Sequence, residues 1–246
     1  MTAISAEPSP PSTVVATLAE PPRARRWPWV LGMLLALAAV VYLCRAPLLT
    51  GAARGLVVGE TPERFSAIVI LGGDRYYPVA AAVQRAHPNC SVIVFQRGDQ
   101  RLEQIGVLPT TAETARRVLT ACGTPAERIE VLDCADRFDA TRIERLGAWL
   151  SGQPDAQVLL LCDRFSSRRV RRTVDDVLGA AAARVAVHGV VHPWYDEDSW
   201  WQRKEGAVDL LNNYVSLAYV WLNGPDRANG PRWNPDDYRQ SLVLAP

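Results

Sequence analysis

Residues 67–83, AIVILGGDRYYPVAAAV, decide the fold of this 246-residue chain. The stretch opens with an unbroken apolar run, halts at Gly72-Gly73-Asp74 and continues with alanine-rich sequence. A short apolar run that ends at turn residues is typical of a buried strand. Pro78 suits the first turn of a helix, where its missing N–H costs nothing. The stretch therefore predicts a buried strand, a tight turn and a helix.

The same alternation continues to residue 224. Further strands are expected over residues 91–95, 128–132, 156–162 and 183–191, with apolar residues at helical spacing between them. Because these strands are nearly all apolar, both faces of their sheet must be covered. The sequence predicts an α/β fold: a three-layer, Rossmann-like domain over residues 50–224 with a mainly parallel sheet of about five strands. On its helices we expect four buried side chains, Trp149, Val174, Leu211 and Tyr214.

An uncharged apolar segment, Trp27–Cys44, precedes this domain. A bilayer core of about 30 Å needs roughly 17–25 such residues in a helix, so we predict a transmembrane anchor over residues 26–46. The alternative is a cleaved signal peptide, for which TGAARG at 50–55 offers a cleavage site.

Basic residues flank the apolar segment unevenly. Arg23, Arg25 and Arg26 crowd its N-terminal side, whereas Arg45 and Arg54 are sparser beyond it. The positive-inside rule then predicts a single-pass protein of the inner (plasma) membrane with an extracytoplasmic domain. Residues 1–25 contain five prolines and no periodicity, which is typical of a disordered tail, here cytoplasmic. Residues 225–246 are expected to form a C-terminal surface tail.

Net charge, cysteines and histidines narrow the class of protein. A net charge of +1 argues against a dedicated nucleic-acid binder. None of the five cysteines forms a CxxC pair, and we interpret the four beyond Cys44 as small buried side chains, although an oxidising exterior would permit disulfides. His188 and His192 would share an ion only on a helix; in a strand they stand roughly 13 Å apart. No metal site and no catalytic triad is therefore predicted.

Open parallel sheets bind ligands beyond the carboxyl ends of their strands. The residues at those ends are the candidate ligand-binding residues: Gly72, Gly73, Asp74, Gln96, Arg97, Gly98, Asp163, Arg164, Ser166 and Arg169. Helix N-termini point N–H donors at the same edge, and with the arginines they favour an anionic ligand. The plain alternatives are a tight turn at the glycines and a solvated arginine face. If the turn approaches a ligand, Gly73→Val should abolish binding.

The serial order of several segments resembles the YdcF/SanA/ElyC-like family. These segments are the apolar anchor, GLVVGETPERFSAIVILGGD (55–74), AETARRVLTACGTPAERI (112–129), the arginine-rich helix and NNYVSLAYVWL (212–222). The resemblance covers about residues 50–224. It implies a Rossmann-like domain anchored at the inner membrane, facing outward and linked to envelope integrity and to peptidoglycan or lipid-carrier metabolism. One branch of the family looks able to bind a nucleotide-like cofactor.

The chain departs from the family pattern at its polar positions. Ser166 stands where the family has a histidine, with Arg169 retained, and Gln96-Arg97-Gly98 replaces Ser-Gly-Gly. Asp139-Ala140-Thr141 is what remains of an Asn-Thr-x-x-Asn-like stretch, so the resemblance adds Asp139 and Thr141 to the candidate ligand-binding residues. Asn213 and Ser216 replace an acidic residue and a lysine. Serine cannot take over the proton transfer of a histidine, which weakens the case for catalysis.

Three functions remain open at this point. The first is a cell-envelope enzyme acting on a phosphorylated or lipid-linked glycan precursor. The second is a degenerate, non-catalytic member that binds such a ligand or an envelope partner. The third is a cytoplasm-facing protein that binds a nucleotide-like cofactor. The expected partners are the membrane, through Trp27–Cys44, and a small anionic or lipid-linked ligand; the sequence names neither a cofactor nor a protein partner.

Overall fold

A computed structural model describes residues 27–59, 62, 64–97, 103, 106–134 and 139–226. The predicted tail over residues 1–25, Gly98 and residues 227–246 of the predicted C-terminal tail lie outside the described residues. The chain forms two compact units, Met1–Arg45 and Ala46–Pro246. Each unit is described by itself below.

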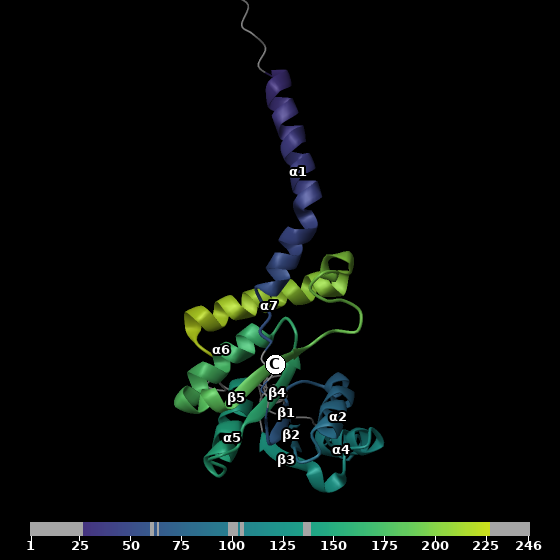
Figure 1. Cartoon of the computed structure of the whole chain (residues 1–246), viewed down its shortest axis with the longest axis vertical. Coiled ribbons are helices and arrows are strands. Elements are labelled where there is room, and N and C mark those ends of the chain that lie inside the picture. Colours follow the sequence, from purple (N-terminus) through teal and green to yellow (C-terminus); the bar gives the residue numbers. More distant parts are fainter. Residues whose placement is uncertain are drawn as a thin grey trace, which may run out of the picture. The chain divides into compact units, whose positions relative to one another are not determined.

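The second unit is a Rossmann-like α/β domain built on a five-stranded, all-parallel sheet of order β3-β2-β1-β4-β5 (Figure 1). The strands are β1 (Ala67–Ile70), β2 (Ser91–Arg97), β3 (Ile129–Cys134), β4 (Val158–Asp163) and β5 (Val185–Val190). Each strand falls within or overlaps one of the predicted apolar runs, so the predicted fold is confirmed. The chain moves outward from β1 through β2 and β3 and then returns to the other side of β1 with β4. The topological switch point therefore lies between β1 and β4.

Helices cover both faces of the sheet (Figure 1). The α-helices are α1 (Trp27–Arg54), α2 (Tyr77–Ala86), α4 (Thr111–Ala121), α5 (Asp139–Ser151), α6 (Ser167–Leu178) and α7 (Lys204–Asn223). The 3-10 helices are η1 (Asp74–Tyr76), η2 (Ala126–Arg128), η3 (Gly179–Arg184) and η4 (Trp200–Gln202). The helices α5 and α6 bury Ile143, Leu146 and Val174 against one face, and α2 and α4 bury Ala81 and Leu119 against the other. Because both faces are covered, the central strand β1 is wholly apolar and buried, whereas the edge strand β3 also carries Glu130 and Asp133.

The burial predicted for four helical side chains is confirmed at one position and wrong at two. Val174 is fully buried, and Trp149 is half-buried and donates from Nε1 to Glu130 Oε2 over 3.0 Å. Leu211 and Tyr214 were predicted to be buried, but they are 62% and 37% exposed. The reason is that α7 packs through a narrow stripe that includes Leu210, and its remaining apolar residues have no layer of the domain above them.

The first unit contains most of α1, which is long and apolar enough to cross a bilayer. A membrane span and a signal sequence share this length and composition. The last turns of α1, from Ala46 on, belong to the second unit. There Ala53 and Leu56 are fully buried, and Leu49 O accepts a hydrogen bond of 3.1 Å from Trp200 Nε1.

The cysteines are free thiols, and three of them, Cys90, Cys134 and Cys162, are buried. Burial raises the pKa of the Cys162 thiol to about 12, so no thiolate is present at neutral pH. We expect these three thiols to resist a disulfide reagent in the native full-length chain and to react once urea unfolds it. Counting the modified thiols with and without urea checks this. Reaction of Cys162 at the rate of an exposed thiol would contradict the burial.

Candidate functional site

The two glycines in the turn after β1 have different structural roles. A Cβ atom on Gly72 would lie 1.8 Å from Cε2 of Tyr76, so Gly72 is needed for the close approach of this tyrosine ring. Gly73 has an ordinary φ of −91°, and a Cβ built on it meets no atom within 4 Å. The first glycine therefore serves packing within the chain, and only the second leaves open space beside the backbone.

That open space is a cavity of about 110 Å³ at the carboxyl end of β1. Its lining includes Gly72, Gly73 and Asp74 from the turn, Thr111 from α4 and Arg142 from α5. About 10–15 Å³ of space measured in this way holds one water, so the cavity has room for several waters or for a phosphate-sized group.

Two charged residues, Asp74 and Arg142, line this cavity, and Arg142 is only 4% exposed. Its Nη1 donates to Leu71 O over 2.7 Å and lies 3.9 Å from Asp139 Oδ1. The other oxygen of Asp139 accepts a bond of 2.6 Å from Arg169 Nη1. Asp139 and Arg169, both predicted ligand-binding residues, are thus brought together, and two guanidinium groups share one carboxylate. The trio carries one net positive charge, which the carboxylate of Asp74 at the cavity balances.

The anion-binding position at the N-terminus of α4 is filled by the chain itself. Gln96 Oε1 accepts from Ala112 N over 2.8 Å, and Gln96 Nε2 donates to Glu103 Oε2 over 3.2 Å. Glu103 also accepts from the backbone N–H and hydroxyl of Thr111. Because helix N-termini favour a carboxylate, Gln96 and Glu103 satisfy N–H donors that a ligand would otherwise use. Thr110 and Glu113 form the capping box of the same helix.

A second hollow, of about 430 Å³, is lined in part by Arg75, the residue that follows Asp74. Its lining residues are Arg75, Tyr195, Lys204, Glu205, Val208, Asp209 and Asn212. Arg75 forms an ion pair with Asp163 at the end of β4, so the pair bridges the topological switch point. Both charged side chains are partly exposed. The hollow offers two cations together with carboxylate and amide groups.

A hydrogen-bonded tyrosine, Tyr195, lines this second hollow, and His192 stacks on that tyrosine. Tyr195 Oη donates to Asp209 Oδ2 over 3.1 Å, and burial, followed by the charge of Asp209, raises the pKa of Tyr195 to about 12. The His192 ring stacks on Tyr195 at 4.1 Å, and burial lowers the pKa of His192. Its Nδ1 accepts from Trp194 N over 3.3 Å, which leaves the proton on Nε2. A neutral imidazole thus lies at the carboxyl edge of the sheet, where it can accept or pass a proton.

Other predicted site residues are used within the chain. Arg164 Nε donates to Glu197 Oε1 over 2.6 Å, and Arg164 Nη1 donates to Gly189 O. The charge of Arg164 is therefore balanced by Glu197 within the chain. Ser166 Oγ donates to Asp163 O over 3.0 Å. Thr141 is half-buried on α5, and Arg97 ends β2. Arg164 and Arg169 therefore do not line the cavity at Gly73 together.

Several residues of the site were missed from the sequence. Arg142 lies one helical turn before Leu146 and beside Ile143, and an arginine next to two apolar core positions is a signal that could have found it. Arg75, Tyr195 and Asp209 had no such signal, because they meet only through the fold. Asn213 Nδ2 donates to Asp209 Oδ1 over 2.9 Å and so holds the nearby carboxylate in place.

The arrangement can hold an anion beside groups that bind hydroxyls. Among the described residues, no group of three or more His, Cys, Asp or Glu side chains is placed to hold a metal ion. The chain matches no protein-family model, and a search of curated proteins found no match either. The geometry at the edge of the sheet therefore carries the functional argument.

Proposed function

We propose that this chain is a membrane-anchored cell-envelope protein whose carboxyl-edge site binds an anionic ligand of the phosphorylated or lipid-linked glycan type. One observation carries the proposal: the buried guanidinium of Arg142 lines a phosphate-sized cavity at the open backbone of Gly73. A buried arginine beside free space is a strong site for a phosphate oxygen. The membrane anchor is the segment Trp27–Cys44 within α1.

The two hollows suit the two parts of such a ligand. The small cavity takes the phosphate, and the larger hollow takes a sugar next to it. Asp209 and Asn212 offer oxygens and an amide to sugar hydroxyls, while Lys204 and Arg75 add positive charge. Asp74 lines the small cavity and can accept a hydroxyl hydrogen bond at its rim.

The resemblance to the YdcF/SanA/ElyC-like family supports the same proposal. It supplies the envelope setting, the outward orientation and the link to peptidoglycan or lipid-carrier metabolism. Since Ser166 stands at the family's histidine, we propose binding as the function that the residues support best, with His192 the candidate group for any proton transfer. A non-catalytic binding module and a nucleotide-like cofactor binder remain the alternatives.

The Gly73 position offers a direct test of ligand entry. Gly73→Val should weaken binding of UDP-N-acetylglucosamine or a short polyprenyl phosphate by at least about tenfold, because the side chain fills the cavity while the backbone needs no change. Its melting temperature should stay near that of the wild-type protein. Calorimetric titration and thermal shift of the full-length protein in detergent measure both quantities. Unchanged affinity with bound ligand would place the ligand elsewhere.

Two arginines provide the matched control for charge. Arg75→Gln should weaken binding, whereas Arg164→Gln should leave it unchanged because Arg164 faces Glu197. The Arg75 ion pair is partly exposed, and Arg75 also donates to Tyr76 Oη, so the substitution should cost the fold about 1–2 kcal/mol. Arg164, a candidate ligand-binding residue from the sequence, serves here as the control because Glu197 holds its guanidinium. Equal weakening by the two substitutions would contradict the proposed site.

A further inference from the structure

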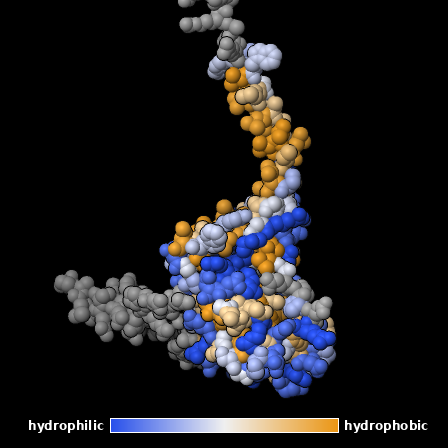
Figure 2. Space-filling model, turned by 60° about the vertical axis from the view of Figure 1, so that its left-hand side comes forward, coloured by the Kyte–Doolittle hydropathy of each residue, from blue (hydrophilic) through white to orange (hydrophobic). Residues whose placement is uncertain are grey.

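After its charged first turn, Lys204-Glu205, α7 has an outward face that is mainly apolar from Val208 to Leu222. The exposed apolar residues are Val208, Leu211, Tyr214, Val215, Ala218, Tyr219, Trp221 and Leu222. Leu222 and Trp221 are 83% and 74% exposed, and no charged residue occurs between Asp209 and Asp226. Hydrophobic residues are visible at the surface of the second unit in Figure 2. A continuous apolar face of this kind marks an interaction surface.

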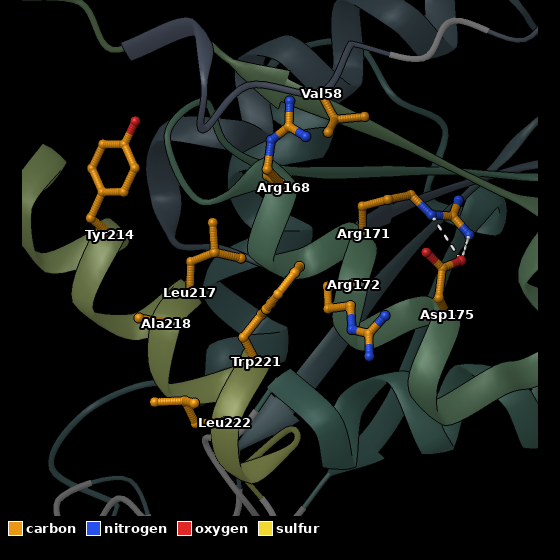
Figure 3. A pocket seen from close by; sticks show the side chains of 10 residues that line it. All are labelled: Val58, Arg168, Arg171, Arg172, Asp175, Tyr214, Leu217, Ala218, Trp221 and Leu222. Atoms are coloured by element: carbon orange, nitrogen blue, oxygen red, sulfur yellow. Dashed lines mark hydrogen bonds and ion pairs between the residues drawn. The ribbon is translucent and has the colours of Figure 1, made fainter. Parts of the chain in front are cut away.

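Beside this face lies a groove of about 630 Å³ between α6 and α7. Leu217 and Trp221 of α7 stand across the groove from Arg168 and Arg172 of α6 (Figure 3). Arg171 pairs with Asp175 on the same helix, and Arg172 lies 3.0 Å from Asp176. Three guanidinium groups thus face two carboxylates, so the polar wall keeps a positive excess.

Within the second unit, α7 and the residues just before it bind the segment that follows Arg45. Tyr214 Oη donates to Ala52 O over 2.5 Å, and Trp200 Nε1, just before α7, donates to Leu49 O. Eight residue steps separate Cys44, where the uncharged segment ends, from Ala52. Even a fully extended chain covers at most about 29 Å in eight steps. If Trp27–Cys44 spans a bilayer, α7 cannot move far from the lipid surface.

We propose that the α6–α7 face, defined by the exposed apolar residues of α7 and the arginines of the groove, lies in the headgroup layer of the bilayer. Trp221 and Leu222 insert among the upper acyl chains, and Arg168 and Arg172 bind lipid phosphates. Tryptophan, tyrosine and leucine on one face with arginine beside them are the composition of an interfacial helix. Because the tether is short, the bilayer lies within reach of this face, and no protein partner is needed to cover it. The inference needs a retained anchor and does not depend on the ligand site.

A depth measurement on the full-length protein tests this placement. Spin labels are placed at Leu211→Cys, Leu222→Cys or, as the control, Thr120→Cys, an exposed site on α4. The background carries Cys44→Ala and Cys122→Ala, since the other three thiols are buried. In vesicles of equal parts phosphatidylcholine and phosphatidylglycerol, the ratio of oxygen to nickel-complex collisions should be at least about fivefold higher at the α7 labels than at Thr120→Cys.

Charge reversal and dilution separate the remaining outcomes. Arg168→Glu with Arg172→Glu should lower the collision ratio at Leu222→Cys, whereas Arg75→Gln, which tests the ligand site, should not change it. Nickel access at α7 equal to that at the control would overturn the proposal. Labels shielded from both reagents, with spin–spin broadening that weakens as the protein is diluted in lipid, would assign the face to a second copy and would also overturn it.

Discussion

Replacing Tyr76 with alanine should lower the free energy of unfolding by about 3–5 kcal/mol. The tyrosine ring is fully buried, packs on Gly72 where a Cβ would clash, and belongs to the core cluster beneath α2 and α4. Its hydroxyl accepts a bond of 3.0 Å from Arg75 Nε. Tyr76→Phe keeps the ring and should lose about 1 kcal/mol, the value of that hydrogen bond. Urea unfolding followed by tryptophan fluorescence measures both.

The close contact with Tyr76 also explains why residue 72 is a glycine. On its own, Gly72→Ala should cost about 1–3 kcal/mol through overpacking against the ring, whereas in the Tyr76→Ala background it should cost almost nothing. A double-mutant cycle gives this coupling directly. Equal costs in the two backgrounds would mean that Gly72 is needed for something other than the approach of Tyr76.

Replacing Arg142 with methionine should lower the free energy of unfolding by about 3 kcal/mol. The substitution leaves the Leu71 carbonyl without the 2.7 Å bond that it accepts from Nη1 and removes one of the two cations beside Asp139. Arg145→Met, on the exposed side of the same helix, is the matched control and should change stability by less than about 0.5 kcal/mol. Similar losses for both would show that Arg142 is not bound as described.

The sheet could be predicted from the sequence because burial of a parallel sheet acts on every residue of a strand. The runs at Ala67–Ile70 and Val158–Asp163 are apolar on both faces, and turn residues mark their ends. Their order in the sheet, with β1 in the centre, comes from the arrangement of the crossovers, which no single run records. The position of the site at the carboxyl edge followed from the fold class, but its individual residues did not.

The site residues were predicted less well, because a polar residue at a strand end can be bound by ligand or by the chain itself. Gln96 and Arg164 stand at the expected edge, yet Ala112 N and Glu197 bind them. Arg142 was missed because it lies among the apolar core positions of α5. For helix α7 the prediction of burial was wrong for another reason. Its apolar period predicts a face that avoids water, but the period does not say whether protein or lipid covers Leu211.

Because the last turns of α1 pack into the second unit, a protease can release an intact domain only by cutting before those turns. A cut within residues 50–55, at TGAARG, would detach Leu49, whose carbonyl binds Trp200, and would cut the chain beside the buried Ala53 or remove that residue. The freed domain would then lose part of the cluster that holds η4 and α7. A soluble form that keeps the complete cluster must therefore begin near Ala46, where the first unit ends. Processing at 50–55 would yield a different and weaker domain from the one that remains attached.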